Sequence, residues 1–163
     1  MKVFEAKDDI VEFGSGYGTF TLPLAERTHN RILAFEIETN LVLKLNEKIK
    51  RSKLSNIFSI ERDIVALGTG LENNSVGYVM IFNLLHHDDP NSILKESYRI
   101  LKHGGTAGLV HWNYDSSTPR GPKMEIRPKP ENMCVWAKEI GFRIESSIPI
   151  DLPPYHYGFL AQK

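Results

Sequence analysis

A glycine-rich segment close to the start of the chain contains residue types that suit ligand binding. Glu12 precedes the three glycines of the run Gly14-Ser-Gly16-Tyr-Gly18, which follows an apolar stretch at residues 9–13. Glycine lets the backbone turn tightly and approach a ligand closely, and the first turn of a following helix offers unpaired N–H groups. By itself, such a loop indicates a ligand site without identifying the ligand.

The spacing of the loop separates two kinds of ligand. Dinucleotide-binding folds use the pattern G-x-G-x-x-G, and here Thr19 stands where that pattern needs its third glycine. Glu12, two residues before Gly14, also disfavours a diphosphate, because like charges repel, whereas it would attract a cationic ligand. The sequence therefore favours a positively charged nucleoside, and a nicotinamide-dependent oxidoreductase is the less favoured alternative.

Two further acidic residues follow the next two predicted strands. Glu36 follows the apolar run at residues 31–35, and Asp63 follows the run at residues 57–61. The carboxyl ends of parallel strands meet at one edge of a sheet, which would bring both acids close to the glycine loop. A carboxylate there can accept hydrogen bonds from ribose hydroxyls or from an exocyclic amino group. Together the two acids predict an adenosine site.

The elements that must position these residues are predicted from hydrophobic periodicity. Short apolar runs alternate with amphipathic stretches, which indicates β-α units on a parallel sheet. The run at residues 76–82 is nearly continuous in apolar residues, so we expect a central strand there, buried on both faces. The other expected strands cover residues 9–13, 31–35, 57–61 and 106–112, and the expected helices cover residues 19–27, 40–53, 92–103 and 131–140.

The remaining segments are predicted as loops and a terminal hairpin. Residues 66–75 indicate a loop or a broken helix, and the proline-rich residues 113–130 indicate a long ordered loop. The glycine pair at 104–105 is expected to stop the helix before it. Two last strands, at residues 143–148 and 157–161, are joined by a proline-rich turn and are expected to form an antiparallel hairpin at the sheet edge.

The ordered set of motifs resembles class I S-adenosylmethionine-dependent methyltransferases. The resemblance is carried by Glu12 with its three glycines, Glu36, Asp63, the run Asn83-Leu-Leu-His-His87, and the run Arg99-Ile-Leu-Lys-His-Gly-Gly105. The run from Asn83 to His87 is most similar to the small-molecule, type 11-like branch. The resemblance implies one doubly wound, Rossmann-like α/β domain over residues 1–163, with a seven-stranded, mostly parallel sheet and an antiparallel last strand. It also implies S-adenosylmethionine as cofactor.

The resemblance assigns the first group of residues to the methionine and ribose parts of the cofactor. Gly14, Gly16 and Gly18 would wrap these two parts, with Glu12 near the amino group. Glu36 would hold the ribose hydroxyls. These assignments are expectations that follow from the family.

A second group is assigned to the adenine ring and to the far end of the methionine. Ile37 would pack on one face of adenine, and Asp63 would accept a hydrogen bond from its amino group. The backbone of Ile64 would meet the ring edge. Asn83 and Leu84 would line the methionine side.

Residues that could act on a methyl acceptor follow the fourth and fifth strands. His86 and His111 are the candidate general bases, since a histidine titrates near neutral pH. Trp112 and Tyr114 would lie at the same edge of the sheet. The structural alternative is that the histidines cap the next helix or pack its loop, and we favour this alternative for His87. No metal site is expected: His86, His111 and Asp88 are suitable ligand types, but they lack a regular spacing.

The proline-rich loop carries four basic residues, Arg120, Lys123, Arg127 and Lys129, which could bind an anionic acceptor. The alternative is a solvated loop stiffened by its prolines. Two motif-like features are interpreted as structural. Leu152-Pro-Pro-Tyr155 begins with Leu and lies in the last hairpin, so we expect a turn, and Cys134 is expected in the core of a helix.

Composition limits the partners and the cellular compartment that we expect for this chain. The chain of 163 residues holds 20 Lys and Arg against 20 Asp and Glu, and this neutral balance makes a nucleic-acid partner unlikely on charge grounds. Together with the resemblance to the small-molecule branch, this balance leads us to expect a small-molecule acceptor. A single cysteine excludes an internal disulfide and fits the cytoplasm. Apolar stretches of about ten residues are too short to span a membrane.

Residues 1–8 are all that precede the first predicted strand, whereas the family usually adds one or two helices there. We therefore expect one of three situations: the methionine end of the cofactor is open, another copy of the chain covers it, or the chain is a shortened version of a longer protein. This leaves an alternative function, that of a cofactor-binding subunit that is non-catalytic or depends on a partner.

Overall fold

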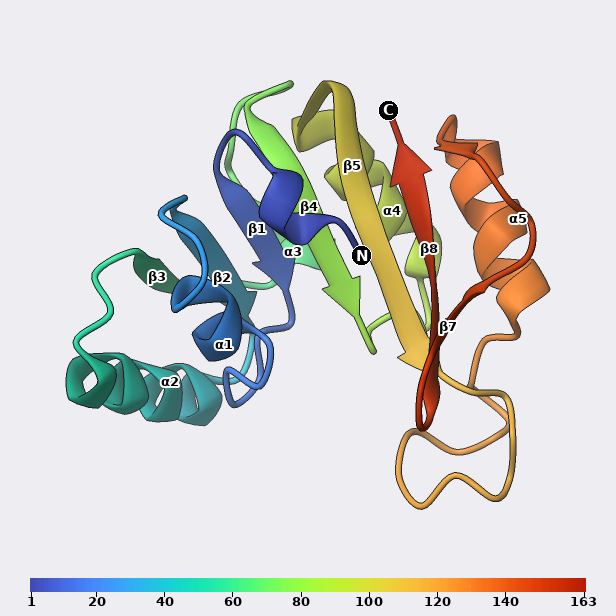
Figure 1. The fold of residues 1–163 in the computed structure, drawn as a ribbon, viewed down its shortest axis with the longest axis horizontal. Coiled ribbons are helices and arrows are strands. Elements are labelled where there is room, and N and C mark those ends of the chain that lie inside the picture. The colour runs from blue at the N-terminus through green and yellow to red at the C-terminus, as the bar shows by residue number, and fades with distance from the viewer.

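An eight-stranded sheet forms the centre of the fold in the computed structural model, which describes residues 1–163. The strand order is β3-β2-β1-β4-β5-β8-β6, with β7 paired to β8. The strands β1 to β5 pair in parallel, and β8 runs antiparallel to β5 (Figure 1). Their bounds are β1 Ile10–Phe13, β2 Ile32–Glu36, β3 Ile57–Glu61, β4 Val76–Phe82, β5 Leu101–Trp112, β6 Arg143–Ile144, β7 Ile150–Leu152 and β8 His156–Gln162.

Helices cover both faces of this sheet (Figure 1). The helices α1 (Thr21–Ala25) and α2 (Thr39–Ser52) lie on one face, and α3 (Ile64–Leu67), α4 (Pro90–Ile100) and α5 (Pro130–Ile140) lie on the other. Each face has its own hydrophobic core. The amphipathic α2 buries Val42 and Leu45 while its lysines point outward, as its periodicity predicts. A short 3-10 helix, η1 (Val3–Glu5), precedes β1.

The predicted α/β fold class is confirmed, and the central position of the fourth strand explains where a ligand can bind. After β1 the chain moves outward through β2 and β3, then crosses to the other side of β1 to form β4 and β5. The strand order reverses between β1 and β4, and ligands of such sheets bind in the crevice beyond the carboxyl ends at that point. The carboxyl ends of β1, β4 and β5 lie at the same end of the molecule as the loop 113–129 (Figure 1).

The predicted boundary between the fourth helix and the fifth strand was wrong. The helix α4 ends at Ile100, and residues 101–103 already belong to β5. Leu101 is fully buried and pairs with Val76, and the register then shifts so that Tyr78 pairs with Thr106. Gly104, with φ of +79°, lies within this irregularity. The glycine pair therefore accommodates a bulge within the strand, where we expected it to stop the helix.

The C-terminal part differs from the prediction in strand number. The expected strand at 143–148 is shortened to β6, and the additional strand β7 forms within the segment expected to be a turn, which gives eight strands where seven were expected. The last strand is antiparallel, as predicted, but it lies between β5 and β6 and is not at the edge. The turn at residues 153–155 joins β7 to β8, and Cys134 is buried in α5, so both structural interpretations are confirmed.

Residues 113–129 contain no helix or strand, as predicted for the proline-rich loop. None of the helices combines the length and the apolar character needed to cross a membrane.

Candidate functional site

The glycine loop leaves β1 in a conformation that only glycine adopts readily. Gly14, Gly16 and Gly18 all have positive φ, at +72°, +54° and +76°. A Cβ atom on Gly18 would lie 2.6 Å from the Leu45 side chain of α2, so the loop packs closely on that helix. At Gly16, by contrast, a Cβ atom would meet nothing within 4 Å. The middle of the loop therefore faces open space, where a ligand can approach the backbone.

Glu36, the last residue of β2, fastens this loop to its neighbouring strand. Its side chain is 8% exposed, and Oε2 accepts a hydrogen bond of 2.8 Å from the backbone N–H of Gly16. Oε1 accepts hydrogen bonds from the N–H groups of Ile37 and Glu38 at 2.9 and 3.1 Å. A carboxylate offers about four lone-pair positions, so Glu36 retains capacity to accept hydrogen bonds from hydroxyl groups as well.

Glu12, in β1, is the most buried acid of the site. It is 2% exposed, and its Oε2 accepts a hydrogen bond from the Thr21 hydroxyl of α1. Burial raises the pKa of Glu12 to about 8; the hydrogen bond from Thr21 opposes this shift, and the negative charge of Glu36 adds to it. No lysine, arginine or histidine forms an ion pair with Glu12. The site therefore holds a buried acid that lacks a positive partner.

Asp63 begins the short helix α3 beside a cavity of about 660 Å³. Its Oδ1 accepts hydrogen bonds of 2.9 Å from the N–H groups of Val65 and Ala66, which fixes the carboxylate at the end of β3. The structure brings about half of the predicted site residues together in the lining of this cavity. They are Gly14, Glu36, Ile37, Asp63, Ile64, Leu84 and His86, whereas Glu12, Gly16, Gly18, Asn83 and His111 lie outside its lining.

The segment after β4 forms the other side of the crevice. Leu84 contacts the glycine loop closely, because a Cβ atom on Gly14 would lie 3.2 Å from Leu84 Cδ1. Asn83 has a left-handed backbone, with φ of +56°, and its Nδ2 lies 3.3 Å from His156 Nε2. Asn83 Oδ1 is buried without a hydrogen-bond partner, as is Ser15 Oγ in the glycine loop. Two unpartnered polar atoms therefore lie in the two segments that flank the crevice.

His86, in the segment after β4, and His111, near the end of β5, form a pair. His86 Nδ1 lies 3.3 Å from His111 Nε2, and the rings meet edge to face. His111 is 0% exposed, and burial lowers its pKa to about 3, with a smaller contribution from His86. Burial also lowers the pKa of His86, and the neighbouring His87 adds to the shift. Both rings are therefore neutral at pH 7.

The other histidines near the site have different surroundings. His87 Nδ1 accepts a hydrogen bond of 3.0 Å from the N–H of Asp89 just before α4, which is the structural role that we favoured for it. No group of three or more His, Cys, Asp or Glu side chains is arranged to hold a metal ion. His156, at the start of β8, stacks on Trp112 with ring centroids 4.2 Å apart.

Sequence reasoning missed two residues of this region, Thr21 and His156. Thr21 reaches Glu12 from the helix after the glycine loop, and His156 reaches the site because Trp112 pairs with it across β5 and β8. The contact of His156 has no local sequence signal. A polar residue in the first turn after the glycine loop could have drawn attention to Thr21.

One of the four basic residues of the proline-rich loop is bound within the loop itself. Arg127 is 7% exposed, and its guanidinium donates hydrogen bonds to the carbonyl oxygens of Asn113, Asp115, Arg120 and Pro122 and to the Thr118 hydroxyl. All of its donor nitrogens are thus used within the loop. Arg127 therefore stabilises the conformation of the loop, and it has no free pair of N–H donors with which to bind an anion.

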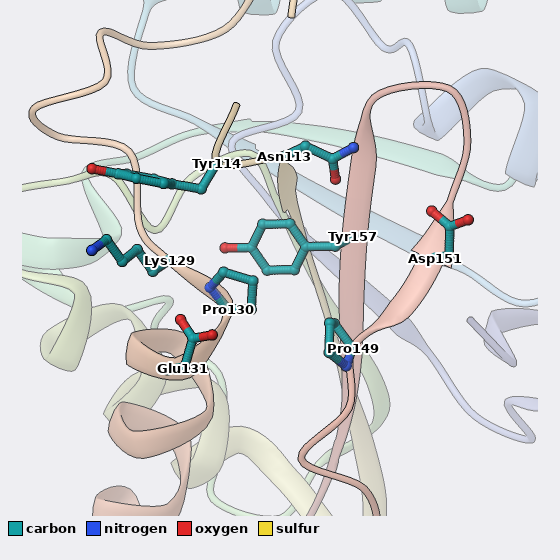
Figure 2. A pocket seen from close by; sticks show the side chains of 8 residues that line it. All are labelled: Asn113, Tyr114, Lys129, Pro130, Glu131, Pro149, Asp151 and Tyr157. Carbon is teal, nitrogen blue, oxygen red and sulfur yellow. The ribbon is translucent and has the colours of Figure 1, made fainter. Parts of the chain in front are cut away.

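A second cavity of about 660 Å³ lies between this loop, the start of α5 and the β7–β8 hairpin. Figure 2 shows the Tyr157 side chain pointing toward Pro130 and Lys129, with Tyr114 nearby. Lys129 Nζ lies 5.1 Å from the centre of the Tyr114 ring. None of the predicted cofactor residues lines this second cavity. Tyr114 lines this second cavity and does not line the first.

The fold and the site together define a class: a doubly wound α/β domain with a glycine-rich loop after its first strand and a buried acid at the end of its second strand. A family model described as "Methyltransferase domain" matches residues 10–105, more than half of the chain. The chain belongs to this methyltransferase domain family.

Two curated proteins are similar to parts of the chain. An uncharacterized methyltransferase-like protein of Schizosaccharomyces pombe is 30% identical over 109 residues, which are 67% of this chain and 40% of that protein. Ribosomal RNA small subunit methyltransferase A of Pediococcus pentosaceus is 39% identical over 59 residues, which are 36% of this chain and 19% of that protein. The chain thus aligns with less than half the length of either relative.

Solved structures share the fold over nearly the whole chain. A SAM dependent methyltransferase from Aquifex aeolicus matches with a TM-score of 0.83 and 18% identity, covering 94% of this chain and 80% of that one. A putative type 11 methyltransferase from Sulfolobus solfataricus matches with a TM-score of 0.77 and 24% identity, covering 99% and 88%. Family membership supports S-adenosylmethionine as the cofactor of this site.

The residues present fit this cofactor. Gly16 leaves open space above the loop, and Ser15 Oγ and Asn83 Oδ1 are buried polar atoms that lack partners. Glu12 and Glu36 suit a ligand with cationic and hydroxyl groups, and Ile37 and Ile64 give the first cavity apolar walls suited to a purine ring.

Proposed function

We propose that this chain binds S-adenosylmethionine and catalyses the transfer of its methyl group to a small-molecule acceptor. The observation that carries the proposal is the convergence of the glycine loop, Glu36 and Asp63 on one cavity at the carboxyl edge of the sheet. The formal net charge of 0 supports a small acceptor over nucleic acid.

In this proposal, different residues of the chain bind different parts of the cofactor. The glycine loop and Glu36 hold the ribose, and Ile37, Asp63 and Ile64 hold the adenine. Glu12, Asn83 and Leu84 surround the methionine part. When bound, S-adenosylmethionine supplies an electrophilic methyl group on a sulfonium ion. The chain's main contribution is then to align the acceptor with that methyl group and to receive a proton from the acceptor where one is lost.

We assign the proton acceptor to His86, which lines the first cavity. His111 Nδ1 lies 3.5 Å from the carbonyl oxygen of Trp112, so we place the His111 proton on Nδ1. His111 Nε2 can then accept a hydrogen bond from His86 Nδ1, which leaves His86 Nε2 without a proton. In this arrangement His86 is the catalytic residue. His111, which is fully buried, is a positioning residue that sets the tautomer of His86.

The first test is binding, measured by calorimetry with S-adenosylmethionine, S-adenosylhomocysteine and NAD. We expect binding of both adenosyl ligands and none of NAD. NAD binding without a response to either adenosyl ligand would overturn the proposal.

The second test is turnover, measured with methyl-labelled S-adenosylmethionine and a panel of small amines, phenols, thiols and carboxylic acids. We expect transfer to at least one class, and we expect His86→Gln to lower kcat more than it lowers cofactor affinity. Cofactor binding with no transfer to any class would favour the alternative of a non-catalytic or partner-dependent subunit.

A further inference from the structure

Glu12 is buried in the sheet, and its neighbours along the two flanking strands are apolar. Its register partners in the flanking strands are Ala34 of β2 and Met80 of β4. The one side chain that bonds to it is Thr21 of α1, whose hydroxyl donates to Oε2. Glu12 is therefore buried in the sheet and has one hydrogen-bond partner.

The charged side chain that contributes to the raised pKa of Glu12 is itself negative. This is Glu36 at the end of β2, and neither α1 nor β4 presents a charged side chain to Glu12. An ionised carboxylate that is buried without a positive partner is strongly disfavoured, and a second negative charge nearby increases the cost. The neutral, protonated acid is therefore the favoured form of Glu12 in the ligand-free chain. The raised pKa of about 8 agrees with this environment.

A ligand with a positive charge would make the ionised form of Glu12 the favoured one. A cation close to the carboxyl group favours the ionised form, which lowers the pKa of the acid and drives off its proton. Glu12 lies two residues before the first glycine of the loop that is proposed to hold the methionine part of the cofactor, whose amino group is cationic.

We propose that cofactor binding to this chain is coupled to the release of one proton from Glu12. The O–H bond of the acid breaks, the proton passes to the solvent, and the carboxylate pairs with the ammonium group of the ligand. This inference rests on the proposed function, because it requires an adenosyl ligand with an amino-acid tail. In this inference Glu12 recognises the positive charge of the ligand. The residues proposed to bind adenosine recognise the rest of the molecule.

The experiment is calorimetry at pH 7 in buffers with different enthalpies of ionisation, because the dependence of the binding enthalpy on the buffer gives the number of protons released. We expect about one proton released for S-adenosylhomocysteine and S-adenosylmethionine, falling toward zero above the pKa of Glu12. We expect none for 5′-methylthioadenosine, which carries the nucleoside without the amino group. The affinity for S-adenosylhomocysteine should also fall about tenfold for each pH unit below pH 7.

Three variants isolate the contribution of Glu12 from that of the ligand's own amino group. Glu12→Gln keeps the shape of the neutral acid and an oxygen for Thr21, so the ligand should bind without this proton release. Its affinity should be weaker than wild type at pH 8 and should approach the wild-type value as the pH falls. Thr21→Val removes the hydrogen bond that lowers the pKa of Glu12, so the pH profile should shift to higher pH. Glu26→Gln, an exposed acid after α1, should release as many protons as wild type.

The outcomes separate this inference from the proposed function. If no adenosyl ligand binds, the proposed function fails. If adenosyl ligands bind but wild type and Glu12→Gln release the same number of protons, the function stands and the inference is overturned. An equal release with 5′-methylthioadenosine would also overturn it, because the amino group would then have no part in the coupling.

Discussion

The carboxylate of Glu36 holds the backbone of Gly16 through a hydrogen bond of 2.8 Å, so the end of β2 fixes the loop that follows β1. The residue expected to bind ribose therefore also shapes the glycine loop. This double role links the geometry of the loop to the acid that recognises the ligand.

Replacing Glu36 should consequently weaken ligand binding through both roles. We expect Glu36→Ala to reduce the binding free energy of S-adenosylhomocysteine by on the order of 1–3 kcal/mol, the usual cost of leaving buried polar groups unpaired. Calorimetry would measure this loss. Glu38→Ala, which alters an exposed side chain two residues further on, is the matched control and should bind normally. Equal affinities for wild type and Glu36→Ala would show that the adenosine lies elsewhere.

Variants of Asp63 can separate its contribution to folding stability from its contribution to ligand binding. Its Oδ1 caps α3, so Asp63→Ala should lower the free energy of unfolding by about 1 kcal/mol, whereas Asp63→Asn retains a capping oxygen and should cost less. Both variants should weaken adenosyl-ligand binding, since neither offers a free carboxylate oxygen to the adenine amino group. Thermal unfolding and calorimetry on the same samples would test this. Full affinity in Asp63→Asn would mean that Asp63 is only a helix cap.

The sequence was sufficient to predict the parallel part of the fold because the signals for those strands are local. Each of β1 to β4 is an apolar run bounded by turn residues or acids, and the structure has these strands within one residue of their predicted ends. The start of β5 was missed because residues 101–103 continue the helical periodicity of α4. What makes them a strand is the pairing of Leu101 with Val76, a contact between distant parts of the chain.

The distinction between local signals and contacts of distant residues also applies to the site. Gly14, Glu36 and Asp63 could be predicted because each follows a strand, and the topology of parallel sheets brings strand ends together. Thr21 and His156 could not, since their contacts with Glu12 and Asn83 depend on how α1 and β8 pack. The role of Arg127 was also hidden, because its partners are carbonyl groups that any residue provides.

Arg127 provides a prediction about the loop that follows β5. Arg127→Met removes the guanidinium that joins the carbonyl groups of Asn113, Asp115 and Pro122, so the loop should open and become sensitive to proteolysis. Thermolysin digestion should cut this variant within residues 113–129 faster than wild type. Arg120→Met, at an exposed position of the same loop, serves as control. Affinity for S-adenosylhomocysteine should remain unchanged, because Arg127 does not line the first cavity. Wild-type resistance in Arg127→Met would contradict this role.

The buried ring of His111 predicts how stability changes in acid. Burial lowers the pKa of His111 to about 3, so the folded chain keeps this ring neutral while the unfolded chain protonates it below about pH 6.5. The unfolded state then binds more protons, and stability should fall as the pH drops from about 6.5 toward 3, by at most about 1.4 kcal/mol per pH unit for this residue. His111→Gln should make this dependence shallower in urea unfolding at pH 7.5, 5.5 and 4.5. His103→Gln, at an exposed position, should leave it unchanged. Identical slopes for wild type and His111→Gln would show that the buried ring does not control acid stability.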